Sequence, residues 1–118
     1  MANAHYQNIL ANQLAMNRQT WVVLERYGVT ESSMLRLDFT YYAPSREAAA
    51  ALSALLQQET DYDVSVAGSG WFFRRRWLVQ GTTQPTAVSP TILDQWVTWM
   101  VAAGAKLNCD FDGWGTAP

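Results

Sequence analysis

The segment MLRLDFTYY, residues 34–42, decides the fold, because apolar and polar side chains alternate along it. The apolar set is Leu35, Leu37, Phe39 and Tyr41, and the other set is Arg36, Asp38, Thr40 and Tyr42. A period of two is that of a β-strand with one buried face. Residues 34–42 therefore predict a strand in a sheet that is covered on one face only.

The residues after this strand predict a helix. Pro44-Ser45 ends the strand, and Ser45 is a good N-cap with Glu47 in the favourable first turn. The helix is expected to run from Ser45 to about Gln58. Its expected buried residues are Ala48, Leu52, Leu55 and Leu56.

A β-hairpin is expected next. Tyr62–Val66 alternates like a short strand, Gly68-Ser69-Gly70 is a turn signal, and a further strand is expected from Trp71 to about Gln80. A polar loop, residues 81–88, would follow.

The last third predicts one more helix. Ser89-Pro90 combines an N-cap with proline at the first helical position, and Gly104 suits the C-cap after Ala102 or Ala103. The expected buried stripe is Ile92, Trp96, Met100 and Ala103. The tail, residues 106–118, is the candidate for an additional edge strand.

Residues 4–26 complete the pattern as an N-terminal helix that Gly28 ends. Without this helix the order is β-α-β-β-α-β, which is typical of a ferredoxin-like sandwich. We therefore expect an α+β fold in a single domain, residues 1–118. An antiparallel sheet would carry helices on one face, with an extra N-terminal helix.

Composition excludes several classes of protein. Of the 118 residues 49% are hydrophobic and 15% charged, which argues against disorder, and no apolar run is long enough to span a membrane. The N-terminus lacks the features of a secretory signal. The net charge of −2 disfavours a strongly basic nucleic-acid binder. Because Cys109 is the single cysteine, a reducing, cytoplasmic location fits best.

Catalytic and metal-binding groups are scarce, so no catalytic residue, metal or cofactor is predicted. His5, the single histidine, lies near the N-terminus, where a solvated side chain is the better interpretation. Asp110 beside Cys109 disfavours a reactive thiolate. Asp110 and Asp112 have the spacing of a small metal-binding pair, but turn and cap hydrogen bonds are the more common role.

The segment WFFRRRW, residues 71–77, interleaves arginines with aromatic residues. Such a composition suits single-stranded RNA, with Trp71, Arg74 and Arg76 as the contacting residues. The alternative interpretation is a strand whose arginines pair with charges on the open face, among them Asp38. We favour this second interpretation.

The tail resembles a known family. Phe111-Asp112-Gly113-Trp114, placed after the last helix, is similar to the C-terminal signature of the regulator of ribonuclease E activity B family, the ribonuclease E inhibitors. The likeness covers about residues 17–116. It implies a ferredoxin-like fold and a non-enzymatic cytoplasmic regulator that binds an endoribonuclease and restrains RNA degradation.

Three functional hypotheses follow. The first is protein binding through Asp110, Phe111, Asp112, Gly113 and Trp114. RNA binding through residues 71–76 is the alternative, and a homodimer closed through the open sheet face or the last helix is the third. Asp112-Gly113 favours a tight turn that folds Trp114 back onto the sheet or the last helix. The main expectation for Trp114 is thus a structural latch, and the other is an exposed contact residue.

Overall fold

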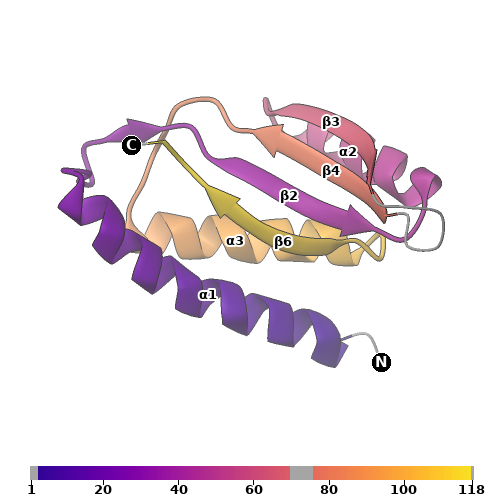
Figure 1. Cartoon of the computed structure of the whole chain (residues 1–118), viewed down its shortest axis with the longest axis horizontal. Helices are drawn as coiled ribbons and strands as arrows, with labels where there is room; N and C mark the ends of the chain where they lie inside the picture. The colour runs from indigo at the N-terminus through magenta and orange to yellow at the C-terminus, as the bar shows by residue number, and fades with distance from the viewer. Residues whose placement is uncertain (1–2, 70–75, 118) are drawn as a thin grey trace.

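The computed structural model of the chain describes residues 3–69 and 76–117 (Figure 1). Within these ranges the elements are α1 (Asn3–Arg26), β1 (Met34–Leu35), β2 (Asp38–Ala43), α2 (Arg46–Glu59), β3 (Asp63–Ser69), β4 (Arg76–Thr82), β5 (Thr86–Ala87), α3 (Pro90–Ala105) and β6 (Asp110–Gly115). Helices and antiparallel sheets together make this an α+β fold, as expected. No helix in the described ranges has the length and apolar character needed to cross a membrane.

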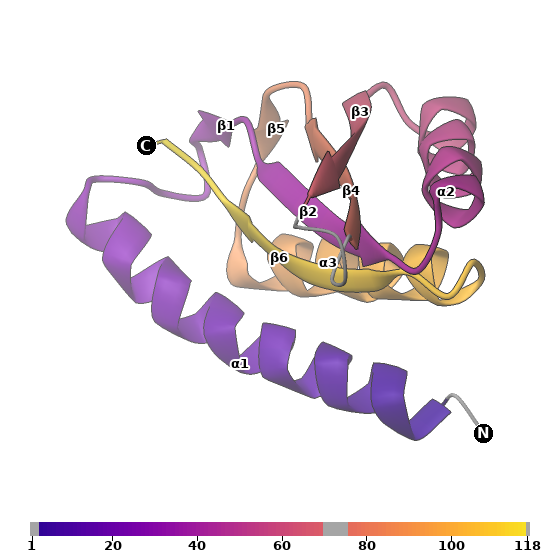
Figure 2. The same cartoon turned by 45° about the vertical axis from the view of Figure 1, so that its right-hand side comes forward.

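The main sheet has the strand order β3-β4-β2-β6, and every neighbouring pair is antiparallel. Helices α2 and α3 lie on one face, while α1 runs beside α3 along the β6 edge (Figures 1 and 2). The prediction of one covered and one open face is confirmed. The prediction of an edge strand in the tail is confirmed by β6.

The core lies between the main sheet and α2 and α3. Alternate strand residues face it, so Phe39, Tyr41, Val79 and Phe111 are buried. The helices contribute chiefly Leu52, Leu56, Val97 and Met100. The Tyr41 hydroxyl donates a 2.6 Å hydrogen bond to the Met100 carbonyl, which satisfies the polar atom of this buried ring.

The predicted strand 34–42 is wrong in one respect, because the chain divides it. Met34–Leu35 pairs with Thr86–Ala87 in a separate small sheet. Thr86–Ala87 lies within residues 81–88, which were expected to form a loop. At the break, Leu37 N–H donates to Thr83 Oγ1, and Thr83 N–H donates to the Leu37 carbonyl. A side-chain acceptor thus replaces one ladder hydrogen bond, and the alternation of residues 34–42 continues across it.

The last helix also differs from the prediction. Its buried residues are Leu93, Val97, Met100, Val101, Ala103 and Gly104, whereas Ile92 is exposed and Trp96 half-buried. Gly104 lies inside the helix, and the positive φ of 58° belongs to Asn108. A Cβ on Gly104 would come within 2.7 Å of the Tyr41 ring and of the Cys109 carbonyl. Close packing, rather than a left-handed cap, therefore requires this glycine.

Both hairpin strands lie closer to the C-terminus than predicted. Gly68 and Ser69, expected in the turn, belong to β3, and Ser69 pairs with Arg76. Trp71 and Arg74, the RNA-contacting candidates, lie outside the described residues. The other helix boundaries were close to prediction: Ser45 caps α2, and Gly28 follows α1 with a φ of 87°.

Candidate functional site

The FDGW segment forms most of the edge strand β6. Phe111 lies opposite Tyr41 and Trp114 opposite Phe39, so both rings face the helical layer. Asp112 has no partner on β2, because it is the extra residue of a β-bulge. Gly113 has a φ of 146°, a conformation that a side chain would strain.

Trp114 is held from two sides. Its Nε1 donates a 2.8 Å hydrogen bond to Asn17 Oδ1, and its ring lies 6.1 Å edge-to-face from that of Trp96. Asn17, only 2% exposed, in turn donates to Asp94 on α3. Gln13 donates to the Asp112 carbonyl. The indole therefore ties α1, α3 and the main sheet together, as a structural latch would.

The acidic side chains of β6, those of Asp110 and Asp112, point elsewhere. Asp112 is exposed, and Asp110 accepts a 3.0 Å hydrogen bond from His5 near the start of α1. The pattern of the tail is thus two apolar anchors inside and two carboxylates outside.

Cys109, which precedes Asp110 in the chain, is not a reactive cysteine. Cys109 is fully buried, and its Sγ lies 3.5 Å from the Leu107 carbonyl. Burial raises the pKa of this thiol to about 11, and the Asp110 carboxylate adds to the shift. At neutral pH the thiol stays protonated, so it is a poor nucleophile and a poor metal ligand.

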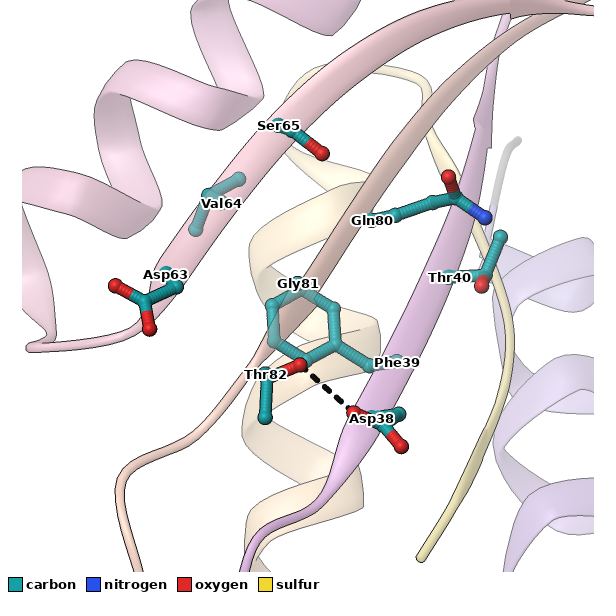
Figure 3. A pocket seen from close by; sticks show the side chains of 9 residues that line it. All are labelled: Asp38, Phe39, Thr40, Asp63, Val64, Ser65, Gln80, Gly81 and Thr82. Atoms are coloured by element: carbon teal, nitrogen blue, oxygen red, sulfur yellow. Dashed lines mark hydrogen bonds between the residues drawn. The ribbon is translucent and has the colours of Figure 1, made fainter.

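The open face of the main sheet presents rows of side chains that the strand register aligns, and the first two rows are polar. The first row is Asp63, Thr82 and Asp38, the second is Ser65, Gln80 and Thr40, and the third is Ala67, Leu78 and Tyr42. Figure 3 shows the first two rows, with the Thr82 hydroxyl donating a 2.7 Å hydrogen bond to Asp38. On β6 the first two rows end at Gly115 and Gly113, which add no side chain, and the third ends at Asp110.

Two hollows lie side by side on this face. The first, of about 400 Å³, spans the two polar rows (Figure 3). The second, of about 330 Å³, lies between β2, β6 and α1, and Met16 and Trp114 line it together with Asp112. Asp38 and Thr40 line both hollows. The two hollows therefore adjoin across β2.

Arg76 lies at the far end of the same face. Its guanidinium is 4.9 Å from the centre of the Tyr42 ring, a cation–π distance. The expected pairing with Asp38 is wrong for Arg76, because Asp38 faces Thr82, six residues further along β4. That offset corresponds to about 20 Å of strand. Trp77, on the other face, has Arg46 near its ring.

The rows were not foreseen. The alternation that predicted β2 and β3 already placed Asp38, Thr40, Asp63 and Ser65 on one side of their strands. Their alignment depends on the register of β4, and Gly81 helps to fix it, because the Phe39 ring occupies the space where its side chain would be. No local pattern in the sequence predicts the contact between Phe39 and Gly81.

Two further features of the sequence are its potential metal ligands and the exposed Trp99. No cluster of three or more potential metal ligands exists among the residues that the structure describes. Trp99, three residues from Trp96, is 41% exposed and borders a small hollow between α2 and α3.

No family model matches the chain, and no curated protein matches its sequence.

Proposed function

We propose that this chain is a non-enzymatic protein-binding regulator that resembles the ribonuclease E inhibitors and restrains RNA degradation by binding the endoribonuclease. The observation that carries the proposal is the tail strand β6: the rings of Phe111 and Trp114 anchor it, and the carboxylates of Asp110 and Asp112 lie at the surface of this sheet edge. Charges on the paired backbone of an edge strand suit recognition, because little backbone freedom is lost on binding. The proposal places the protein in the cytoplasm, where it would meet its partner.

The arrangement of elements supports a finer fold assignment, a ferredoxin-like sandwich. Without α1 and the small sheet, the order is β2-α2-β3-β4-α3-β6, and the strands are ordered β3-β4-β2-β6. Both helices of this unit cover the same face. This β-α-β-β-α-β arrangement is the one that the family resemblance implies.

The test is a binding and cleavage assay with purified endoribonuclease E. The chain should bind the enzyme and slow its cleavage of a single-stranded RNA. Asp110→Asn/Asp112→Asn should weaken binding about tenfold or more, as losses of interface charges do. Glu25→Gln/Glu31→Gln, which changes the net charge equally at exposed positions, is the matched control. Absence of binding by the correctly folded chain would overturn the proposal.

RNA binding is the second candidate, and the observation in its favour is Arg76 stacked on Tyr42 at the open face. Asp38 and Asp63 on that face would repel phosphates. A filter-binding assay with single-stranded RNA at low salt distinguishes the two functions. Retention of RNA that falls steeply with salt would favour this candidate instead.

A further inference from the structure

The open face of the main sheet carries one sign of charge around its hollows. Asp38, Asp63 and Asp112 line them, and no lysine or arginine of residues 3–69 and 76–117 does so. Arg36 precedes β2 and lines neither hollow, and Arg76 lies at the other end of the face over Tyr42. Among the residues that the structure describes, the charged groups lining the hollows are therefore all carboxylates.

These carboxylates are available to a ligand. All three side chains belong to exposed residues. Within the described ranges the Asp38 carboxylate accepts only the Thr82 hydroxyl, and the side chains of Asp63 and Asp112 make no hydrogen bond or ion pair. Each retains acceptor capacity, and charge-assisted hydrogen bonds from guanidinium or ammonium groups are stronger than neutral ones.

The hollows also suit the apolar stems of basic side chains. Met16, which is 52% exposed, lines the second hollow together with Asp112. Lysine and arginine place their methylene stems on such surfaces while the charged end reaches a carboxylate. In the first hollow the hydroxyls and the amide of Thr40, Ser65 and Gln80 supply further hydrogen-bonding groups.

The spacing of the two hollows fits an extended chain. They adjoin across β2 and share Asp38, so they are separated by about one to two strand spacings of ~4.8 Å each. Side chains on the same side of an extended segment repeat every ~7 Å. Two basic residues at alternate positions of one segment could thus enter both hollows.

We propose that the open face of the main sheet binds an extended basic segment of a protein partner, whose lysine or arginine side chains enter the two hollows and pair with Asp38, Asp63 and Asp112. The inference rests on the proposed function, since it names the chemistry of the partner. It extends the binding surface from Asp112, which both proposals use, across the open face to Asp38 and Asp63. The occupant follows from the complementarity of charge.

The experiment uses a fluorescent peptide of about ten residues that alternates arginine with serine, and a control peptide with glutamate in place of arginine. By anisotropy at low salt, the full chain should bind the arginine peptide at least about tenfold more tightly than the control. Asp38→Asn/Asp63→Asn should weaken that binding about tenfold, and added salt should weaken it further. Glu25→Gln/Glu31→Gln should change it less than about twofold. Circular dichroism checks that each variant is folded.

Three results would overturn the inference. One is no binding of the arginine peptide, and another is an equal loss in both double variants, which would mean that net charge alone attracts it. The third is a dimer, seen by sedimentation at two concentrations, that Asp38→Asn/Asp63→Asn dissociates, because the face would then belong to a second copy.

The same variants separate this inference from the proposed function. Suppose that Asp38→Asn/Asp63→Asn binds the endoribonuclease as the parent chain does, while Asp110→Asn, which leaves the three carboxylates of the hollows in place, does not. The regulator proposal would then stand, and the basic-segment site would fall for that partner. Peptide binding at the face without any endoribonuclease binding would keep the site and remove the proposed partner.

Discussion

The two faces of the main sheet are built from the same strands and differ in almost every physical property. Phe39, Tyr41 and Phe111 face the helices and are buried, whereas Asp38 and Thr40 alternate with them and face outward. On the covered face, shape decides what can be substituted. On the open face, the polar groups are hydrated and can change at little cost to folding. The contrast teaches that stability and recognition are divided between alternate residues of one strand.

The largest expected effect is on the covered face. Phe111 is 3% exposed, so Phe111→Ala should lower the free energy of unfolding by about 3–5 kcal/mol, through lost burial and the cavity left behind. Urea denaturation measures it. Asp112→Ala, one residue along and exposed, is the matched control and should change the value by less than about 0.5 kcal/mol. Similar losses for both variants would contradict the contrast.

Gly81 tests whether the covered face is filled to its limit. A Cβ at this position would come within 2.5 Å of the Phe39 ring and of the Asp63 carbonyl. Gly81→Ala should therefore destabilise by about 1–3 kcal/mol, as overpacking does. Thermal melts measure this loss. Gln80→Ala, on the open face beside Gly81, should leave the stability nearly unchanged in the same experiment. A stable Gly81→Ala would mean that β4 can shift to make room.

The tail provides an intermediate case, because its latch is polar as well as apolar. Trp114→Phe keeps a ring but removes the donor to Asn17, and should cost about 1–2 kcal/mol. Asn17→Ala removes the acceptor. In a double-mutant cycle the two changes should couple by about 0.5–1.5 kcal/mol. Additive losses would show that the hydrogen bond contributes nothing and that the ring alone holds α1.

How far the sequence predicts this molecule follows from the same division. Binary alternation and cap residues located β2, α2 and the start of α3, because these signals are local. The buried faces of α1 and α3 were harder to predict from the sequence. Gln13 and Asn17 are polar and yet among the most buried residues of α1, since they bond to the Asp112 carbonyl and to Trp114.

The candidate site was predicted in part for the same reason. The tail could be identified from its order of residues, but the inward direction of Phe111 and Trp114 depends on the pairing of β6 with β2. The rows of the open face depend on register, which is set by contacts between segments far apart in the chain. Asp38 was expected to pair with Arg74 or Arg76, and the register rules out Arg76.

The smallest expected effect on stability, and the one that most sharpens the contrast, is on the open face. Asp38 and Asp63 lie on either side of Thr82, so their Cα atoms are about two strand spacings, or ~10 Å, apart. Two exposed like charges at that distance repel weakly, and Asp38→Asn keeps an oxygen that can accept the Thr82 hydroxyl. Asp38→Asn/Asp63→Asn should therefore alter the free energy of unfolding by less than about 0.5 kcal/mol in urea denaturation. A loss above about 2 kcal/mol would mean that these carboxylates stabilise the sheet rather than serve as free binding groups.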